Sequence, residues 1–302
     1  MGKVLLQVNN LSVAFRMYDK GLRRRELTVI SGLSVSVAEG EILAVAGSSG
    51  SGKSLLAHAI CGILPRNAVV SGEMLYRNER LTPESVKKLR GHEIALVPQS
   101  VEYLDPLMKV GRQVSRDKAA VKEVFAKYRL CAETCKMYPF QLSGGMMRRV
   151  LCATAAISGA RLIIADEPTP GMSKELAARA MKHFRDLADD GAAVMLITHD
   201  IDLALGYADR IAVFYAGTTV ETAPVSDFES ESSLRHPYTK ALWRAMPVNG
   251  FAPTAGVQPY AGSLPEGCLY APRCDMRQEE CMRKVPELRM LRGGEVCCPY
   301  AD

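Results

Sequence analysis

The chain has 302 residues, of which 48% are hydrophobic and 24% charged, and a net charge of +5. This composition is ordinary for a globular protein, so it excludes bulk disorder and fibrous repeats, and the length suits one large domain or two modest ones. No apolar stretch approaches the roughly 18 residues that cross a bilayer, because the longest, such as Ala192–Ile197, are strand-sized. The first residues lack the apolar block of a signal peptide, which predicts a cytoplasmic protein.

The first hundred residues alternate strand and helix signals. Half-buried strands are expected at Val4–Val8 and Leu33–Val37, where apolar residues alternate with small or polar ones. The apolar run Ile42–Ala46 predicts a buried strand that enters a glycine-rich loop, and Ser54–Ile63 predicts the helix after that loop. Another short buried strand is expected at Ile94–Pro98.

Residues from about 100 to 158 have helical spacing and few strand signals. Helices are expected at Lys118–Lys127 and Gly145–Ile157, so this part reads as a helical insertion. Beyond it the predicted elements are strands at Leu162–Ala165, Ala193–Thr198 and Ile211–Phe214 and a helix at Lys174–Asp189. Alternating strands and helices predict a mostly parallel sheet with helices on its faces.

The pattern fades after about Ser233. One helix is expected at Tyr238–Ala245, followed by the Gly/Pro-rich stretch Pro247–Pro265 and a cysteine cluster. We therefore expect two parts, residues 1–235 and a separate C-terminal appendage, residues 236–302.

The segment Gly47–Ser54 matches the pattern G-x-x-x-x-G-K-S. Its glycines let the backbone wrap closely around phosphates with several N–H groups pointing inward, and the following helix presents its positive end. Lys53 can reach the β- and γ-phosphates, and Ser54 can ligate Mg²⁺. The predicted phosphate-binding residues are Gly47, Ser48, Ser49, Gly50, Ser51, Gly52, Lys53 and Ser54.

Two carboxylates end the apolar strand that begins at Leu162. Asp166 can hold Mg²⁺ through water, and Glu167 can orient or deprotonate an attacking water. Many strands end in Asp or Glu, so these two carboxylates alone are weak evidence for a catalytic site. They become a candidate site because a phosphate-binding loop precedes them in the chain.

A serine and two glycines, Ser143, Gly144 and Gly145, open the helix that precedes this strand. Free N–H donors at such a helix start can face an anion, although a plain capped helix is the alternative. Gln99 and His199 each follow a predicted strand. Alone they would be a surface glutamine and a structural histidine.

Together these motifs resemble the ATP-binding subunit of an ABC transporter. The phosphate-binding loop, Gln99, the signature Leu-Ser-Gly-Gly, Ile-Ile-Ala-Asp-Glu and His199 stand in that family's order and spacing, over about residues 4–230. The resemblance implies an α/β P-loop NTPase cassette: a mostly parallel sheet, an antiparallel β subdomain, a helical subdomain at about residues 100–158, and here a small cysteine-rich C-terminal extension.

The C-terminal part is similar to the peptide/nickel importer group, through His236–Pro247 and through Gly267–Cys274 with the cysteines that follow. This resemblance implies ATP hydrolysis that powers uptake of oligopeptides, dipeptides, nickel or a metal chelate. It also implies two permease subunits, a second ATP-binding subunit that is identical or different, and an extracytoplasmic substrate-binding protein. The chain would then lie at the cytoplasmic face of the cell membrane, as a peripheral subunit.

The family mechanism assigns roles to the matching residues. Two subunits close around two ATP molecules, so Ser143, Gly144 and Gly145 would complete a partner's site. Glu167, His199 and Gln99 are the implied catalytic residues, and Ser54, Gln99 and Asp166 the implied Mg²⁺ ligands. An aromatic residue ahead of the loop usually stacks on adenine.

We take Phe15 as that aromatic residue and Tyr18 as the second choice, because Arg16–Leu27 reads as an inserted segment. A plain core position is the alternative for Phe15. Two positions depart from the family: Ser173 stands where an Asp that links the two sites is usual, and Met146 where many relatives have Gln. We expect hydrolysis to persist, because the carboxylates and His199 are present.

Nine cysteines are unusual for a cytosolic protein, and five lie between Cys268 and Cys298. In a reducing compartment such a cluster suggests metal binding rather than disulfides. The spacing of the candidate quartet fits neither the close pairs of structural zinc sites nor ferredoxin runs. The resemblance favours a [4Fe–4S] cluster, with zinc or a metal-free tail as alternatives. The quartet is Cys268, Cys274, Cys281 and Cys298, with Cys297 a possible substitute for the last.

The remaining cysteines, Cys61, Cys131, Cys135 and Cys152, are expected to be small core residues.

Two other functions are alternatives: a soluble ABC ATPase acting on nucleic acid, and an exporter cassette. No heptad run and no basic stripe with aromatics occurs, and Arg23–Arg25 reads as a solvated loop. We therefore expect no nucleic-acid partner. The His236–Pro247 stretch and the cysteine tail argue against an exporter.

Overall fold

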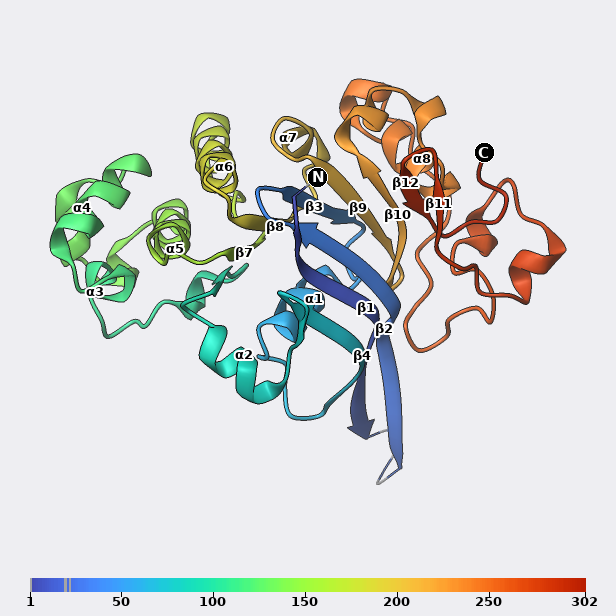
Figure 1. The fold of residues 1–302 in the computed structure, drawn as a ribbon, viewed down its shortest axis with the longest axis horizontal. Coiled ribbons are helices and arrows are strands. Elements are labelled where there is room, and N and C mark those ends of the chain that lie inside the picture. Colours follow the sequence, from blue (N-terminus) through green and yellow to red (C-terminus); the bar gives the residue numbers. More distant parts are fainter. Residues whose placement is uncertain (1, 19–20, 22) are drawn as a thin grey trace.

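The computed structural model describes residues 2–18, 21 and 23–302. An eight-stranded mixed sheet forms its centre, and a four-stranded antiparallel sheet lies beside it (Figure 1). The parallel strands of the large sheet are, in spatial order, β9 (Arg210–Tyr215), β3 (Ile42–Gly47), β8 (Ala193–Ile197), β7 (Leu162–Asp166) and β6 (Ile94–Val97). For these five parallel strands, the predicted bounds are confirmed to within one residue at either end. Both faces of this sheet are covered, so its strands read as continuous apolar runs.

The parallel strands divide their side chains between two hydrophobic cores. Leu43 and Val45 of β3 belong to a core shared with the antiparallel sheet and α1 (Lys53–Ile60). Ile42 and Ala44 belong to the core beneath the helices on the other face. Because successive strand residues point to opposite faces, one short strand contributes to both cores.

The helices on the second face are α5 (Gly144–Ile157), α6 (Lys174–Asp189), α7 (Ile201–Leu205) and α8 (Pro237–Arg244). Figure 1 shows α3 (Val110–Val114), α4 (Lys118–Lys127) and α5 extending to one side, which is the predicted helical part. The helix α2 (Pro83–Leu89) precedes β6. Short 3₁₀ turns lie at Val101–Tyr103, Ala132–Lys136, Pro139–Gln141, Val225–Glu229, Glu231–Ser233, Pro247–Asn249, Ala271–Arg273 and Glu279–Met282. No helix in the described ranges is long and apolar enough to span a membrane.

A long hairpin dominates the antiparallel sheet, formed by β1 (Val4–Tyr18) and β2 (Arg24–Ala38). The strands β4 (Ala68–Tyr76) and β5 (Glu79–Arg80) complete that sheet. The sequence predicted only part of each hairpin strand, because register shifts interrupt the alternation of β1. Within the expected insertion, residues 16–18 and 23–27 belong to the projecting end of this hairpin, whereas residues 19, 20 and 22 lie outside the described part.

The C-terminal extension shares a sheet with the rest of the chain. The strands β11 (Arg289–Leu291) and β12 (Gly294–Val296) form a hairpin, and β12 pairs with β10 (Thr218–Pro224), the antiparallel neighbour of β9. The expected separate appendage therefore differs from the structure: its last strands lengthen the central sheet. Strands of three residues are too short to show an alternating pattern, which is why the sequence did not predict them.

Candidate nucleotide site

The phosphate-binding loop joins the end of β3 to α1 and needs glycine at two of its positions. Gly47 has φ 149°, and a Cβ there would overlap the carbonyl oxygen of Phe214 on the neighbouring strand. Gly52, the residue before α1, has φ 96° and lies against Ile30. Side chains are disfavoured at such φ values, so the loop follows this path only with these glycines.

The Lys53 ammonium lies inside the loop. Its Nζ donates to the carbonyl oxygens of Gly47 and Ser48, each at 2.9 Å. Burial lowers the pKa of Lys53, while the nearby carboxylates of Glu167 and Asp166 act in the opposite direction. A buried cation at the start of a helix, beside free backbone N–H groups, forms a receptor for phosphate.

Asp166 ends β7 next to α1 and is 2% exposed. Burial raises the pKa of its carboxyl, and a hydrogen bond with Ser54 opposes that shift. The Oδ1 atom of Asp166 is buried and has no hydrogen-bond partner in the described part of the chain. A carboxylate oxygen without a partner, next to a hydroxyl, fits Mg²⁺, which prefers oxygen ligands.

Glu167 and His199 form a hydrogen-bonded pair. His199 Nδ1 lies 2.8 Å from Glu167 Oε2, and the Glu167 side chain is 9% exposed whereas that of His199 is 70% exposed. Glu167 has φ 49°, rare for a residue with a side chain. A guanidinium nitrogen of Arg148 donates to the Glu167 carbonyl oxygen at 2.6 Å, and the Glu167 N–H donates to Ile197. These bonds hold the carboxylate at the edge of the sheet.

The loop, Gln99, Glu167 and His199 line one pocket of about 330 Å³. The lining residues are Val29, Ser49, Gly50, Gly52, Lys53, Ser54, Leu55, Gln99, Glu167 and His199. Residues distant in the sequence are thus brought together at the carboxyl ends of parallel strands, where such sheets bind ligands.

The signature residues do not line this pocket. Ser143 caps α5, accepting a hydrogen bond from the Met146 N–H at 3.3 Å, and Gly145 packs so closely that a Cβ would lie 2.8 Å from the Gly171 carbonyl oxygen. Ser143, Gly144 and Gly145 line a second hollow with Pro170 and Gly171. Within one chain, the signature and the phosphate-binding loop therefore belong to different surfaces.

Phe15 lies on β1, half-buried against the core of the antiparallel sheet, and does not line the nucleotide pocket. Val29, on the neighbouring strand, lines it instead. Tyr18 is 65% exposed near the hairpin tip, with the Arg24 guanidinium over its ring. The assignment of an adenine-stacking aromatic stays a prediction.

Sequence reasoning missed several residues that touch this region. Arg148 and Val29 carry no recognisable motif, and the Gln258 side chain accepts a hydrogen bond from the Ser48 hydroxyl in the loop. These residues lie far from their partners in the sequence, so only the folded chain reveals the contacts.

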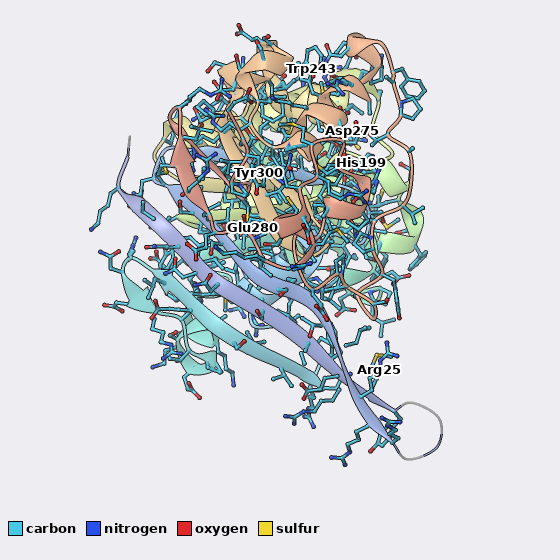
Figure 2. All side chains as sticks on the ribbon, turned by 90° about the vertical axis from the view of Figure 1, so that its right-hand side faces the viewer. Arg25, His199, Trp243, Asp275, Glu280 and Tyr300 are labelled. Atoms are coloured by element: carbon cyan, nitrogen blue, oxygen red, sulfur yellow. The ribbon has the colours of Figure 1, made fainter. Side chains whose placement is uncertain are left out.

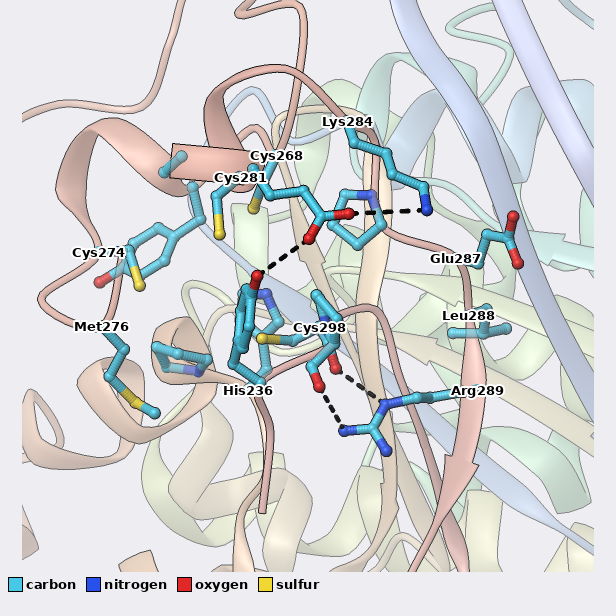
Figure 3. Close-up of a pocket in the computed structure, with 17 residues that line it drawn as sticks. His236, Cys268, Cys274, Met276, Cys281, Lys284, Glu287, Leu288, Arg289 and Cys298 are labelled. Carbon is cyan, nitrogen blue, oxygen red and sulfur yellow. Dashed lines mark hydrogen bonds and ion pairs between the residues drawn. The ribbon is translucent and has the colours of Figure 1, made fainter. Parts of the chain in front are cut away.

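The four candidate cysteines gather around one cavity of about 250 Å³ in the C-terminal extension (Figure 3). Burial raises the pKa of Cys268, Cys274 and Cys298. Cys297 does not line this cavity, and its thiol donates to the Pro286 carbonyl oxygen at 3.0 Å. Within residues 2–18, 21 and 23–302, no three Cys, His, Asp or Glu side chains lie close enough to hold one metal ion.

The other cysteines are not alike. Cys61 and Cys152 are buried, and Cys135 packs at the core's edge. The prediction of a core position is wrong for Cys131, which is exposed and lies 3.2 Å from the Thr134 hydroxyl. Cys131 precedes a short 3₁₀ turn on the surface of the helical part.

Comparison with known proteins agrees with this geometry. The model of the ABC transporter family matches residues 30–170, and that of the oligopeptide/dipeptide transporter C-terminal region matches residues 220–281. A putative peptide import ATP-binding protein of Brucella abortus is 33% identical, over 98% of this chain and 94% of the relative. The dipeptide transport ATP-binding protein DppD of Bacillus subtilis is 34% identical, over 93% of this chain and 90% of that relative.

Solved structures agree on the fold. A dimeric bacterial ABC transporter cassette superimposes with a TM-score of 0.65 at 25% identity, covering 73% of this chain and 99% of that chain. A dimeric post-hydrolysis cassette bound to ADP and Pi gives a TM-score of 0.65 at 24% identity. The chain therefore belongs to the ABC transporter family, as an ATP-hydrolysing cassette subunit with the C-terminal region of the oligopeptide/dipeptide transporters.

Proposed function

We propose that this subunit hydrolyses ATP to drive the import of peptides through partner permeases. The full-length similarity to peptide and dipeptide transport proteins supports this substrate class, because it extends through the C-terminal region. The peptide transport protein SapD of Salmonella typhimurium, 32% identical over 98% of this chain, points the same way. Nickel and metal chelates have no such support, so peptides are the proposed cargo.

The observation that carries the ATPase role is the pocket shared by Lys53, Glu167 and His199. The loop N–H groups and Lys53 bind the phosphates. Ser54, Asp166 and Gln99 would hold Mg²⁺, which would neutralise charge on the phosphate oxygens. Glu167 orients and deprotonates the attacking water, while His199, bonded to Glu167, contacts the γ-phosphate. The buried environment of Lys53 and Asp166 strengthens these charge interactions.

A second cassette completes the site in this proposal. Ser143, Gly144 and Gly145 present a helix start on a different surface from the loop of the same chain, so they suit the phosphates bound by a partner. Two permease subunits and an extracytoplasmic substrate-binding protein complete the importer, with this chain at the cytoplasmic face of the membrane. ATP shifts the permease between states because it binds the closed cassette pair more tightly.

The test is to tag the chain in its native host and purify it from gently solubilised membranes under anaerobic conditions. Two permeases and a substrate-binding protein should co-purify, and the reconstituted complex should hydrolyse ATP faster when that binding protein carries a peptide. Glu167→Gln should bind ATP but lose at least ~100-fold in turnover, in line with the loss of a general base. Recovery of ribosomes or DNA enzymes without membrane proteins would contradict the importer proposal.

We also propose that the cysteine cavity holds an iron–sulfur cluster. The donor set fits, because four thiols face one cavity (Figure 3) and such clusters take four cysteine thiolates. Cys268, Cys274, Cys281 and Cys298 would hold the cluster, which would tie the extension together covalently.

Anaerobic purification tests this proposal. The protein should be brown and contain about four irons per chain, and Cys274→Ser should lose the colour. The control Cys61→Ala, at a buried thiol that does not line the cavity, should keep the colour. Colourless, iron-free protein from anaerobic cells would refute the cluster and leave the metal-free tail.

A further inference from the structure

A loop of the C-terminal extension lies against the phosphate-binding loop. Residues 251–265, here called the strap, contain no helix or strand. The Gln258 side chain of the strap accepts a hydrogen bond from the Ser48 hydroxyl. In Figure 1 the strap is the orange loop that descends beside β2 and β10. The function proposed above gives this contact no role.

Arg273 anchors the first part of the strap. Its guanidinium donates to the carbonyl oxygens of Ala255 at 3.0 Å and Thr254 at 3.4 Å, and to the Tyr215 hydroxyl at 3.3 Å. The same guanidinium lies over the Tyr215 and Tyr270 rings, 5.9 and 5.7 Å from their centres. Several bonds from one planar group fix a loop at little entropic cost, so the strap is held at β9.

The far part of the strap meets the hairpin. Gly262 lies against the Arg25 guanidinium of β2 and the ring of Tyr260. Figure 2 shows Arg25 on the hairpin, away from the labelled residues of the C-terminal extension. The strap thus runs from β9 past the phosphate-binding loop to β2, and Gln258 lies between its two attachments.

Ser48, the residue that Gln258 holds, also orders the phosphate cradle. Its carbonyl oxygen accepts from Lys53 Nζ at 2.9 Å and from the Ser51 N–H at 3.3 Å. A loop rich in glycine loses much conformational entropy when it is ordered. Unless the loop is ordered beforehand, part of the ligand's binding free energy must offset that loss. The strap itself carries no charged residue, so it neither repels phosphate nor competes for it.

We propose that Gln258 is a positioning residue for ATP: the strap holds Ser48 so that the phosphate cradle is formed before the nucleotide arrives. The proposal rests on the ATPase function proposed above. It assigns the C-terminal extension a direct part in nucleotide affinity. Because the strap is anchored by Arg273, next to Cys274 of the cysteine cavity, a change in that cavity can reach the nucleotide site along this route.

The experiment compares ATP affinity and turnover in the full complex. Gln258→Met, which removes the acceptor but keeps the length, should raise KM for ATP about fivefold, the value of one net hydrogen bond, with kcat within twofold. Ser48→Ala should do the same, and the double variant should do no more than either alone. The matched control is Val257→Ala, because Val257 is in the strap and 86% exposed; it should change nothing.

The outcomes separate this proposal from the function on which it rests. An unchanged KM in Gln258→Met, additive effects of the two variants, or a loss of kcat at unchanged KM would overturn the role of Gln258. Absence of ATP binding by the unsubstituted complex would instead overturn the ATPase function. Arg273→Met provides a second readout: it should raise KM in the same direction, and an unchanged KM would contradict the anchoring of the strap.

Discussion

One buried arginine helps to join the C-terminal extension to the cassette. Arg235 is 1% exposed and bonds to Glu221 at 3.2 Å and Asp227 at 2.8 Å. Its guanidinium also donates to the carbonyl oxygens of Leu291 and Arg292, each at 2.6 Å. One cation thus forms ion pairs with two carboxylates and donates hydrogen bonds to two backbone oxygens.

Replacement of this arginine should be costly. Arg235→Met leaves the Glu221 carboxylate buried without its cation, and breaking such a pair costs about 3–5 kcal/mol. Denaturant unfolding of the two proteins measures the difference. The control Arg283→Met removes an exposed pair with Glu279 and should have little effect. Equal stability of Arg235→Met and the unsubstituted chain would show that the ion pair adds nothing.

His236 gives the protein a pH dependence. Burial lowers the pKa of His236 to about 3, and its Nδ1 accepts the Tyr238 N–H at the start of α8. An unfolded histidine titrates near 6.5, so below that pH the unfolded chain takes up a proton that the folded chain refuses. Stability should therefore fall as the pH drops from about 6.5 toward 3, by up to about 1.4 kcal/mol per pH unit from this residue.

The variant His236→Asn tests whether His236 causes this loss of stability at low pH, because Asn also caps a helix but does not titrate. Between pH 7 and 5, the variant should lose less stability than the unsubstituted chain. If the free energy of unfolding falls equally with pH in the variant and in the unsubstituted chain, His236 takes up its proton in the folded state as well. Denaturant midpoints at pH 7, 6 and 5 measure this.

At the scale of elements, the position that departs from the family begins a helix. Ser173 caps α6, its hydroxyl accepting the Leu176 N–H at 3.4 Å. Ser173→Ala should therefore cost about 1 kcal/mol, whereas Ser173→Asp keeps a cap acceptor and should cost almost nothing.

The two variants, Ser173→Ala and Ser173→Asp, separate the role of this position as a helix cap from a role in communication between paired nucleotide sites. If the missing carboxylate weakens communication between paired sites, Ser173→Asp should steepen the dependence of hydrolysis on ATP concentration at unchanged stability. An unchanged Hill coefficient would show that Ser173 matters only as a cap. Calorimetry and steady-state kinetics on the same preparations give both readouts.

The elements that sequence patterns predicted best are those with local determinants. The bounds of α4 and α6 match the expectation, because Asp117 and Ser173 cap helices with clear periodicity. The bulged β1 and the three-residue strands β11 and β12 depend on pairing with distant segments, so no local pattern marks their full extent. The nucleotide pocket was predictable because its chemistry needs particular residues in a row, whereas the contact of Gln258 was not.

At the scale of the molecule, the phosphate-binding loop and the signature lie on separate surfaces. Ser143→Arg should therefore leave the ATP affinity of the isolated chain within twofold, yet abolish turnover in the assembled complex. Lys53→Ala should lose both the ATP affinity of the isolated chain and the turnover of the complex. Nucleotide titration of the chain alone and ATPase assays of the complex distinguish the two. Weakened binding by the isolated Ser143→Arg chain would show that the signature acts within its own subunit.

The pairing of β12 with β10 has a consequence for synthesis on the ribosome. The strand β10 is made well before β12, which pairs with its edge. Arg235 is likewise made before Leu291 and Arg292, whose carbonyl oxygens accept hydrogen bonds from its guanidinium. A nascent chain that has reached the strap thus carries an open sheet edge and a guanidinium that still lacks its two backbone acceptors, and such edges invite wrong partners. The demand for chaperones should therefore peak while the extension is being made.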